Sequence, residues 1–478
     1  MLTTIIQRIS KTFFSIFGLL FFAGVGILGP AYPIAVAFSI FAMFSTVFLI
    51  FVPFSAVLGF GFTQAFGELF ALPFTAGGFR LSMAILLPAF LFLVISAVLR
   101  KDKDIFVIPF KQPVHLMILA FFIVMALSLI NSKNLKVSIM QVQQFVYCII
   151  MYLFITISIK DRDSLRAFIT VLLCASFLVA ILGLVEAAKG KSIFILLHGK
   201  SLFGAHLSSH SVSGPAQRIW GTAGDPEFYG IFMNFILALT LASIFGSDSW
   251  KQRLIFAIFA ILLVTNIIGT AYKGAILATF VSIVIFWNFI EMSGKWMVLA
   301  AVVILISIIG VVASSAFTKL NIERLVSLSG EAGGTVDLRK RNIVIGLHML
   351  KSYPFIGTGP DGFVIQYPRY SHLVAGSRTK AIKAHNTYIQ ILVEYGILGF
   401  TFLMSVFFIT FIRMFQLTKV LKGKDRFLAA GFMAALGGYM SMMMTSNLLL
   451  DLNLWLVIGL SVAMYRIFSV QSSVLVPE

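Results

Sequence analysis

Long, continuous apolar runs are the feature that most constrains this chain. Segments of about 16 to 24 residues with almost no charge recur along most of its 478 residues. About 20 apolar residues in a helix are enough to cross a bilayer, whereas the strands of a membrane barrel give segments of about 10 alternating residues. With 59% hydrophobic and only 11% charged residues, the composition also lies far from that of soluble domains. The sequence therefore predicts an all-α polytopic membrane protein.

Thirteen apolar runs are candidates for membrane crossings. They lie at residues 13–28, 34–52, 81–99, 114–130, 137–159, 167–187, 228–246, 254–268, 275–290, 296–316, 387–412, 427–446 and 452–465. Two chain ends on the inner side require an even number of crossings, so we expect about 12 transmembrane helices. The ambiguity lies in residues 13–80, where residues 53–74 suit a crossing, a re-entrant segment or an interfacial helix. Arg8 and Lys11 before the first run indicate a retained signal anchor.

Basic residues in the short connections predict the orientation. Residues 160–166, 247–253 and 413–426 carry three, two and five Lys or Arg, which makes them cytoplasmic by the positive-inside rule. The two long connections, about 40 residues at 188–227 and 68 residues at 317–384, then lie outside. Long loops translocate largely regardless of their charge, so their own basic residues do not contradict this orientation.

Three regions follow from this topology. Residues 1–316 form an N-terminal bundle of about ten helices that includes the outer loop 188–227, residues 317–384 form a large periplasmic loop with amphipathic helices, and residues 385–478 form C-terminal helices with a short cytoplasmic tail. Cys148 and Cys174 both fall inside apolar runs, which favours small buried hydrophobes over a disulfide or metal pair.

The large outer loop is strongly basic. It holds ten Lys or Arg against four acidic residues, and the whole chain carries a net charge of +18. Such an excess predicts an anionic ligand, although contact with anionic lipid headgroups explains charge alone equally well. Particular residues, and not the net charge, have to distinguish an anionic ligand from anionic headgroups.

Within the loop, Asp337 is suited to cap an amphipathic helix along the membrane surface that reads LRKRNIVIGLHMLKS. Its apolar stripe would consist of Ile343, Leu347 and Leu350. Arg339 and Arg341 would point about 200° apart on that helix, so they cannot both reach one ligand unless its first turn is distorted. Arginine forks two hydrogen bonds onto phosphate, while its alternative role here is contact with headgroups.

Downstream, Gly357, Gly359 and Gly362 spell GxGxxG, but no nucleotide site is expected. That fingerprint needs a preceding strand and a following helix start, neither of which is expected in this loop. The glycines more simply build tight turns. A zinc site is also disfavoured, because the spacings of His198, His206, His210 and His372 match no common zinc pattern.

His385 and Asn386 stand where the chain re-enters the membrane. A histidine there can take a proton from a hydroxyl near neutral pH, and its alternative role is capping or headgroup contact. Glu394 lies about 180° around a continuous helix from His385, so Gln390 is its expected neighbour. Gly396 and Gly399 would form a small-residue patch for close helix packing.

These residues together resemble the bacterial O-antigen ligase and O-antigen polymerase superfamily. The resemblance rests on His385 and Asn386 followed by Gly396 and Gly399, on the preceding Arg339 helix and on PFIGTGPDGF. Two further segments fit: Arg218 before GTAGDPE, with acids at Asp225 and Glu227 where the family carries Asn, and Tyr272, Lys273 and Gly274 in place of a Ser-Arg-Gly turn. The similarity runs from about Phe168 onward.

The resemblance implies a GT-C-like, metal-independent and inverting glycosyltransferase without a cofactor. Its donor would be a glycan on undecaprenyl pyrophosphate at the outer face of the bacterial inner membrane, and its acceptor a glycan or lipid A core. His385 would be catalytic. The pyrophosphate would be bound by Arg218, Lys273, Arg339 and Arg341, with support from Asp225, Glu227, Asn386 and Tyr388. Other polysaccharide-assembly proteins are expected partners, and nucleic acid is not.

Two activities remain open within this class, and two outside it. A polymerase, slightly favoured, would extend a lipid-linked repeat for O-antigen, capsule or exopolysaccharide, whereas a ligase would move O-antigen onto lipid A core. A lipid-linked oligosaccharide flippase would also be basic and polytopic, but transporters usually show repeated halves, which this sequence lacks. A membrane acyltransferase using His385 as base is disfavoured because nothing positions a thioester donor.

Overall fold

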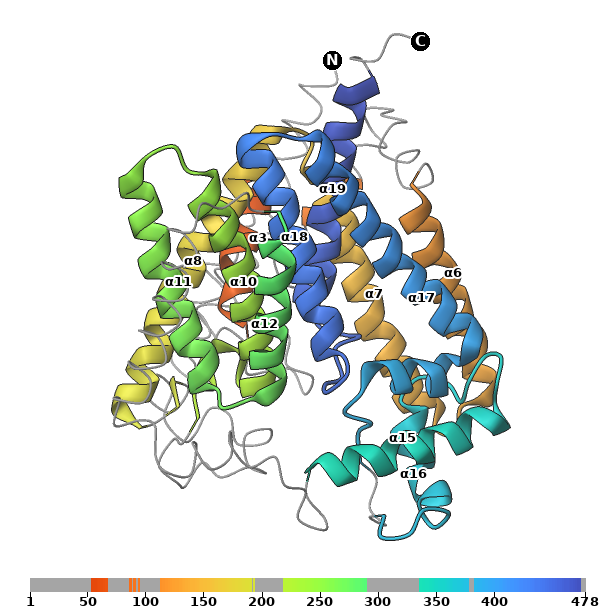
Figure 1. Ribbon diagram of the computed structural model, residues 1–478. Coiled ribbons are helices and arrows are strands. Elements are labelled where there is room, and N and C mark those ends of the chain that lie inside the picture. Colours follow the sequence, from red (N-terminus) through yellow and green to blue (C-terminus); the bar gives the residue numbers. More distant parts are fainter. Residues whose placement is uncertain are drawn as a thin grey trace, which may run out of the picture.

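The fold is a bundle of membrane-length helices. The computed structural model describes residues 53–67, a few positions between 86 and 94, and residues 112–190, 192–193, 218–289, 335–377 and 382–473. Every regular element in those ranges is helical (Figure 1). Seven of these helices are long and apolar enough to cross a membrane, which confirms the all-α membrane class. The total of about 12 stays a prediction, because the runs at 13–28, 34–52 and 296–316 and most of 81–99 lie outside the described residues.

The predicted runs between residues 114 and 290 and between 387 and 465 each coincide with a helix. The seven candidate spans are α6 (Pro113–Ser128, continued by η2, Leu129–Asn131), α7 (Leu135–Ser158), α8 (Arg162–Lys189), α10 (Pro226–Gly246), α11 (Trp250–Gly269), α17 (Thr387–Val420) and α19 (Leu452–Ser473). The other helices are α3 (Pro53–Ala65), η3 (Gly221–Ala223), α12 (Lys273–Trp287), α15 (Thr335–Ser352), α16 (Gly362–Ser371) and α18 (Gly423–Met442). α3, in the ambiguous N-terminal zone, packs against α8.

Small residues and a polar chain join α10, α12 and α18 at the centre of the bundle. A Cβ on Gly438 of α18 would lie only 2.3 Å from Nδ2 of Asn234, so α18 approaches α10 closely. Asn234 donates to Oγ of Ser282 on α12 at 3.1 Å, and Ser282 donates to the Ala434 carbonyl of α18 at 2.9 Å. Such interhelical hydrogen bonds satisfy polar groups that lipid cannot satisfy.

The short basic connections meet at one end of the bundle. Arg166 donates to Asp425 at 3.1 Å, and Lys424 pairs with Asp248 at 2.7 Å, which brings the α7–α8, α10–α11 and α17–α18 connections together. α15 and α16 lie across the opposite end (Figure 1). The bundle therefore has the two unlike ends that the charge pattern predicted, although which one faces the cytoplasm stays a prediction.

The predicted N-cap of the loop helix was wrong. α15 begins at Thr335, two residues before Asp337, so Asp337 lies in the first turn. Its carboxylate pairs with Arg341 one turn later, and an acid in that turn still complements the helix dipole.

The predicted apolar stripe of α15 was also displaced. The helix buries Ile345 and Met349, whereas Leu347 is 44% exposed. Ile345 and Met349 pack with Phe363 of α16 and Val393 of α17 in a small separate core. The buried face of α15 differs from the predicted one because the helix packs against α16 and α17 and not on a flat membrane surface.

A break in α17 at Gly396 organises the end of the bundle that carries α15 and α16. Gly396 has φ 65° and ψ −170°, so it interrupts the helical hydrogen bonds. The segment after α15 supplies replacements: Thr358 N–H donates to the Val393 carbonyl at 2.8 Å, and Ile397 N–H donates to the Pro354 carbonyl at 2.9 Å. Gly396 thus serves backbone docking, and not the helix-packing patch expected from sequence.

Glycines of the GxGxxG segment form the other side of this junction. Gly357 and Gly359 have φ of 71° and 90°, which confirms their predicted role in tight turns. The N–H of Gly359 donates to the Glu394 carbonyl at 3.0 Å. A Cβ on Gly357 would lie 2.3 Å from the backbone of Glu394, so the contact leaves no room for a side chain.

We expect Gly396→Ala to destabilise the fold far more than Gly423→Ala. Both positions have positive φ, which costs an alanine about 1–2 kcal/mol, but a Cβ at 396 meets the Phe355 carbonyl oxygen at 2.2 Å, whereas one at 423 meets nothing within 4 Å. Thermal unfolding of the detergent-solubilised chain, followed by its monodisperse fraction, measures the difference. Equal losses for the two variants would contradict the docking role.

Candidate functional site

His385 is held in place by the start of α17. Asn386 caps this helix by accepting from the Ile389 N–H at 3.1 Å. The next residue, Thr387, donates to the Ser446 carbonyl at 2.6 Å and accepts from the Leu448 N–H at 2.9 Å. These bonds fix the chain to the α18–α19 connection directly after the histidine, which is itself half-buried.

A buried asparagine ties α15 to the same place. Asn342 is 1% exposed, and its Nδ2 donates to the carbonyls of Lys383 and Ala384 at 3.3 and 3.4 Å. Asn342 lies one turn after Arg339, so the bonds set the position of that arginine relative to His385. Asn342 was not predicted from the sequence, because an asparagine inside an amphipathic helix gives no sign of its partner.

Three basic residues from separate segments gather around Tyr272. Arg218 Nε donates to the Thr270 carbonyl in the α11–α12 turn at 2.7 Å, and Lys273 is the exposed first residue of α12. From the outer loop, Arg339 approaches the Tyr272 hydroxyl at 3.5 Å. We call Arg218, Lys273 and Arg339 the cationic cluster. Its members are 55 and 66 residues apart in sequence, so only the fold brings them together.

A buried carboxylate positions the Arg218 segment. Glu186 of α8 is fully buried and accepts from the N–H groups of Trp220 and Gly221 at 2.9 and 3.0 Å. The sequence does contain a signal for this role, because a single acidic residue within an apolar membrane helix indicates a structural or functional partner.

Arg341 points away from the cationic cluster. Its guanidinium hydrogen-bonds the Asp337 carboxylate and the Gly376 carbonyl, while Arg339 reaches Tyr272. The two arginines therefore diverge, as their spacing on a helix predicted.

Acidic groups balance the cluster at the start of α10. Asp225 caps this helix and accepts from the Glu227 N–H at 2.7 Å. The Glu227 carboxylate lies beside the side chains of Tyr272 and Ser446 and within the field of Arg339. Tyr272 also donates to the Thr445 carbonyl at 2.9 Å, so the α18–α19 connection borders the site. This connection was not predicted from the sequence.

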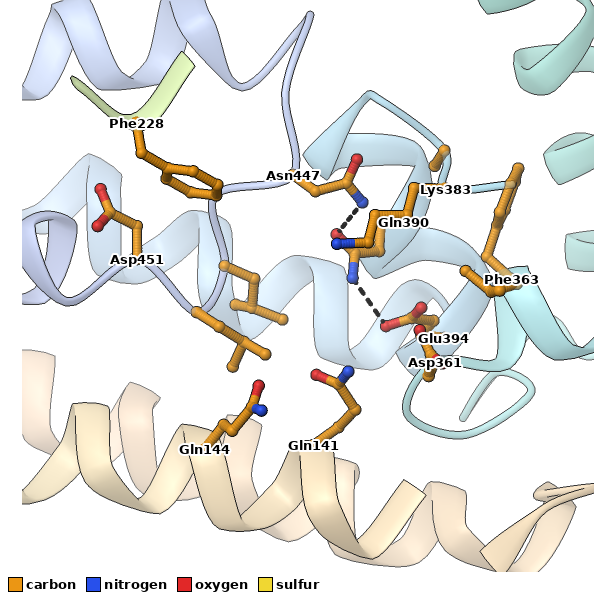
Figure 2. A pocket seen from close by; sticks show the side chains of 14 residues that line it. Gln141, Gln144, Phe228, Asp361, Phe363, Lys383, Gln390, Glu394, Asn447 and Asp451 are labelled. Atoms are coloured by element: carbon orange, nitrogen blue, oxygen red, sulfur yellow. Dashed lines mark hydrogen bonds between the residues drawn. The ribbon is translucent and has the colours of Figure 1, made fainter. Parts of the chain in front are cut away.

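The expected neighbours of His385 on α17 have other contacts. Tyr388 donates to the Met440 carbonyl on α18 at 2.7 Å. The amide of Gln390 donates to Glu394 at 3.2 Å and accepts from Asn447 at 2.7 Å (Figure 2). Gln390 thus links Glu394 to the α18–α19 connection, and the expectation that it orients His385 gains no support from these bonds.

Burial and positive charge favour a neutral His385. Burial lowers the pKa of His385 most, and the charges of Arg339 and Lys383 lower it further, while the charge of Asp225 opposes them. A histidine whose pKa lies below its ordinary value of about 6.5 is unprotonated near pH 7 and can accept a proton.

Backbone strain concentrates around the same residues. Of the part of the chain that the structure describes, three non-glycine residues have positive φ: Ala271, Asp361 and His385, at 48°, 58° and 49°. Ala271 adjoins Tyr272 in the α11–α12 turn. Strained backbone conformations persist where surrounding contacts enforce them, and they cluster at functional sites.

The fold and these residues define a helical membrane protein with a half-buried histidine of lowered pKa beside a cationic cluster. Residues 258–404 match the family model of the O-antigen ligase domain. The match covers the α11–α12 turn, Arg339 and His385, and it supports a relationship to the O-antigen ligase and polymerase superfamily. Arg218 lies outside the match and joins the site through its bond to Thr270. No curated protein matches the chain.

Removing a neighbouring charge should raise the pKa of His385. Lys383→Gln removes one of the two positive charges that lower the pKa of His385. The imidazole therefore loses its proton at a higher pH than in the wild type. Acylation of His385 by diethyl pyrocarbonate at a series of pH values, quantified by mass spectrometry, gives the midpoint. Lys351→Gln, an exposed change at the far end of α15, is the control and should leave it unchanged. A wild-type midpoint at or above about 6.5 contradicts the assignment.

Proposed function

We propose that this protein is a membrane glycosyltransferase of the O-antigen ligase and polymerase type. It transfers a glycan from undecaprenyl pyrophosphate to an acceptor hydroxyl. The observation that carries the proposal is the neutral His385 beside the cationic cluster, within and next to the range that matches the O-antigen ligase domain. The reaction needs both parts, a proton acceptor and positive charge for the leaving group.

The cationic cluster binds the pyrophosphate of the donor. As the bond between the anomeric carbon and the phosphate oxygen breaks, negative charge grows on the pyrophosphate. Arg218, Lys273 and Arg339 stabilise that charge from fixed positions, which is worth most where water is excluded. Protein cations supply this stabilisation, so the proposed reaction is metal-independent. Asp225 and Glu227 balance the cluster and keep its side chains ordered.

His385 acts on the acceptor. The acceptor oxygen attacks the anomeric carbon from the face opposite the pyrophosphate, so the configuration inverts, and the hydroxyl proton passes to the imidazole. The products are the extended glycan and undecaprenyl pyrophosphate. The nearby charge of Asp225 stabilises the imidazolium that forms. Asn386 and Tyr388 hold the start of α17 and thereby the histidine.

The same proposal gives the location and the partners. α15 and α16 lie at the end of the bundle opposite the short basic connections, and α15 is bonded there to the residues directly before His385, which suits a site at the periplasmic face of the inner membrane (Figure 1). The acceptor is either the next lipid-linked repeat, for a polymerase, or lipid A core, for a ligase. The polymerase is the slightly favoured alternative.

His385→Ala should lower transfer by about 10²- to 10⁴-fold, because the general base is lost, while the chain still inserts. The measurement compares the lengths of lipid-linked glycans in the host lacking the gene, complemented with wild type, His385→Ala or the loop control His372→Ala. Single repeats alone indicate a polymerase, and long lipid-linked chains that do not reach lipid A core indicate a ligase. A wild-type profile from His385→Ala contradicts catalysis and leaves a flippase as the better explanation.

Arg339→Lys should impair transfer much more than Arg341→Lys. Lysine keeps the charge but loses the forked hydrogen bonds that suit pyrophosphate, and only Arg339 reaches the site around Tyr272. Initial rates of the purified protein in lipid nanodiscs, at varied donor concentration, provide the comparison. A larger loss of transfer in Arg341→Lys than in Arg339→Lys would indicate that Arg341 binds the pyrophosphate.

A further inference from the structure

A polar cavity adjoins the segment that precedes His385. It has a volume of about 230 Å³, and its lining includes Lys383 and Ala384, the two residues before the histidine. Figure 2 shows Gln141 and Gln144 of α7 projecting into it from one side, opposite Gln390 and Asn447. The proposed mechanism uses none of these four side chains.

The cavity and the cationic cluster share their walls. On α10, Glu227 lies beside Tyr272 of the cluster while the next residue, Phe228, lines the cavity. In the α18–α19 connection, Ser446 contacts Tyr272 and Asn447 lines the cavity. Adjacent residues of these two elements thus face the two compartments, and the cavity reaches the residue directly before His385.

The cavity has fewer cations than the cluster. Asp361, Glu394 and Asp451 line the cavity against a single basic residue, Lys383. Such a lining offers a pyrophosphate a single cation, and it offers hydroxyl or amino groups several hydrogen-bond acceptors. Asp361 starts α16 without capping it, and in Figure 2 its carboxylate lies beside that of Glu394.

One buried polar atom of the cavity lacks a protein partner. Oδ1 of Asn447 has no hydrogen bond to any residue that the structure describes, and Figure 2 draws no hydrogen bond from Gln141 or Gln144 to the other lining side chains. Amides both donate and accept, and carboxylates accept, which is the set of groups that the hydroxyls of a sugar require. An unpaired buried oxygen costs free energy until a ligand satisfies it.

We infer that this cavity binds the acceptor sugar, a neutral hydroxyl-bearing ring whose nucleophilic oxygen faces His385. Its volume lies below the range of about 300–1,000 Å³ typical of drug-sized ligands, which suits one sugar ring. Phe228 and Phe363 offer flat apolar surfaces to the ring face. The inference rests on the proposed function, since it assigns the second substrate of the same reaction.

The test uses the saccharide released by mild acid from the host's own lipid-linked repeat, and core oligosaccharide in parallel. Each probe lacks the pyrophosphate leaving group, so it can serve only as acceptor. Gln141→Leu and Asp361→Asn should raise the KM for the accepted probe about tenfold and leave the KM for the lipid-linked donor unchanged. Gln143→Leu, an exposed glutamine on α7 outside the cavity, is the matched control and should change neither.

Binding measurements separate the two hypotheses. Saturation-transfer NMR should show either probe bound by wild type and lost in Gln141→Leu, with inorganic pyrophosphate binding lost only in Arg339→Gln. Unchanged saccharide binding in Gln141→Leu and Asp361→Asn, or a raised donor KM instead, overturns the acceptor site. No saccharide binding by wild type also overturns it. Loss of saccharide binding in these variants, combined with full transfer by His385→Ala, supports the cavity and rejects the proposed catalysis.

Discussion

The docking of residues 354–359 onto the break in α17 is the interaction on which the rest of the site depends. A membrane helix cannot leave backbone groups unpaired without a cost of several kcal/mol each, so the break at Gly396 persists because the loop pairs with both of its sides. Because residues 354–359 are bound at the break, Asp361 and α16, which follow them in the chain, lie near the start of α17. It also fixes the position of α15 relative to α17, and therefore the position of Arg339.

The distribution of charge around His385 is the second organising principle. Arg218, Lys273 and Arg339 gather around Tyr272 with Asp225 and Glu227 next to them, whereas Asp361 and Glu394 line the cavity together with Lys383. In the proposed reaction the cations serve the anionic leaving group, and their charge also disfavours a proton on the base. Burial lowers the pKa of His385 most, and the charges of Arg339 in the cluster and of Lys383 beside the cavity lower it further.

Predictions from sequence succeeded where a property is local and periodic. The helices from α6 to α12 and from α17 to α19 follow from apolar runs, and the divergence of Arg339 and Arg341 follows from helical geometry. They failed where packing decides. Leu347 is exposed because the packing of α15 against α16 and α17 chose another face, and Gln390 bonds Glu394 because the α18–α19 connection lies beside it.

By itself the sequence determined a helical membrane protein, and the motif around His385 indicated the superfamily that the family match supports. Runs of apolar residues have one stable arrangement in lipid, so no tertiary information is needed for that conclusion. Only the tertiary structure decided which cations surround Tyr272 and which groups line the cavity beside the histidine. Those groups come from helices far apart in the chain, and their meeting depends on close contacts such as Gly438 against Asn234, which no local pattern records.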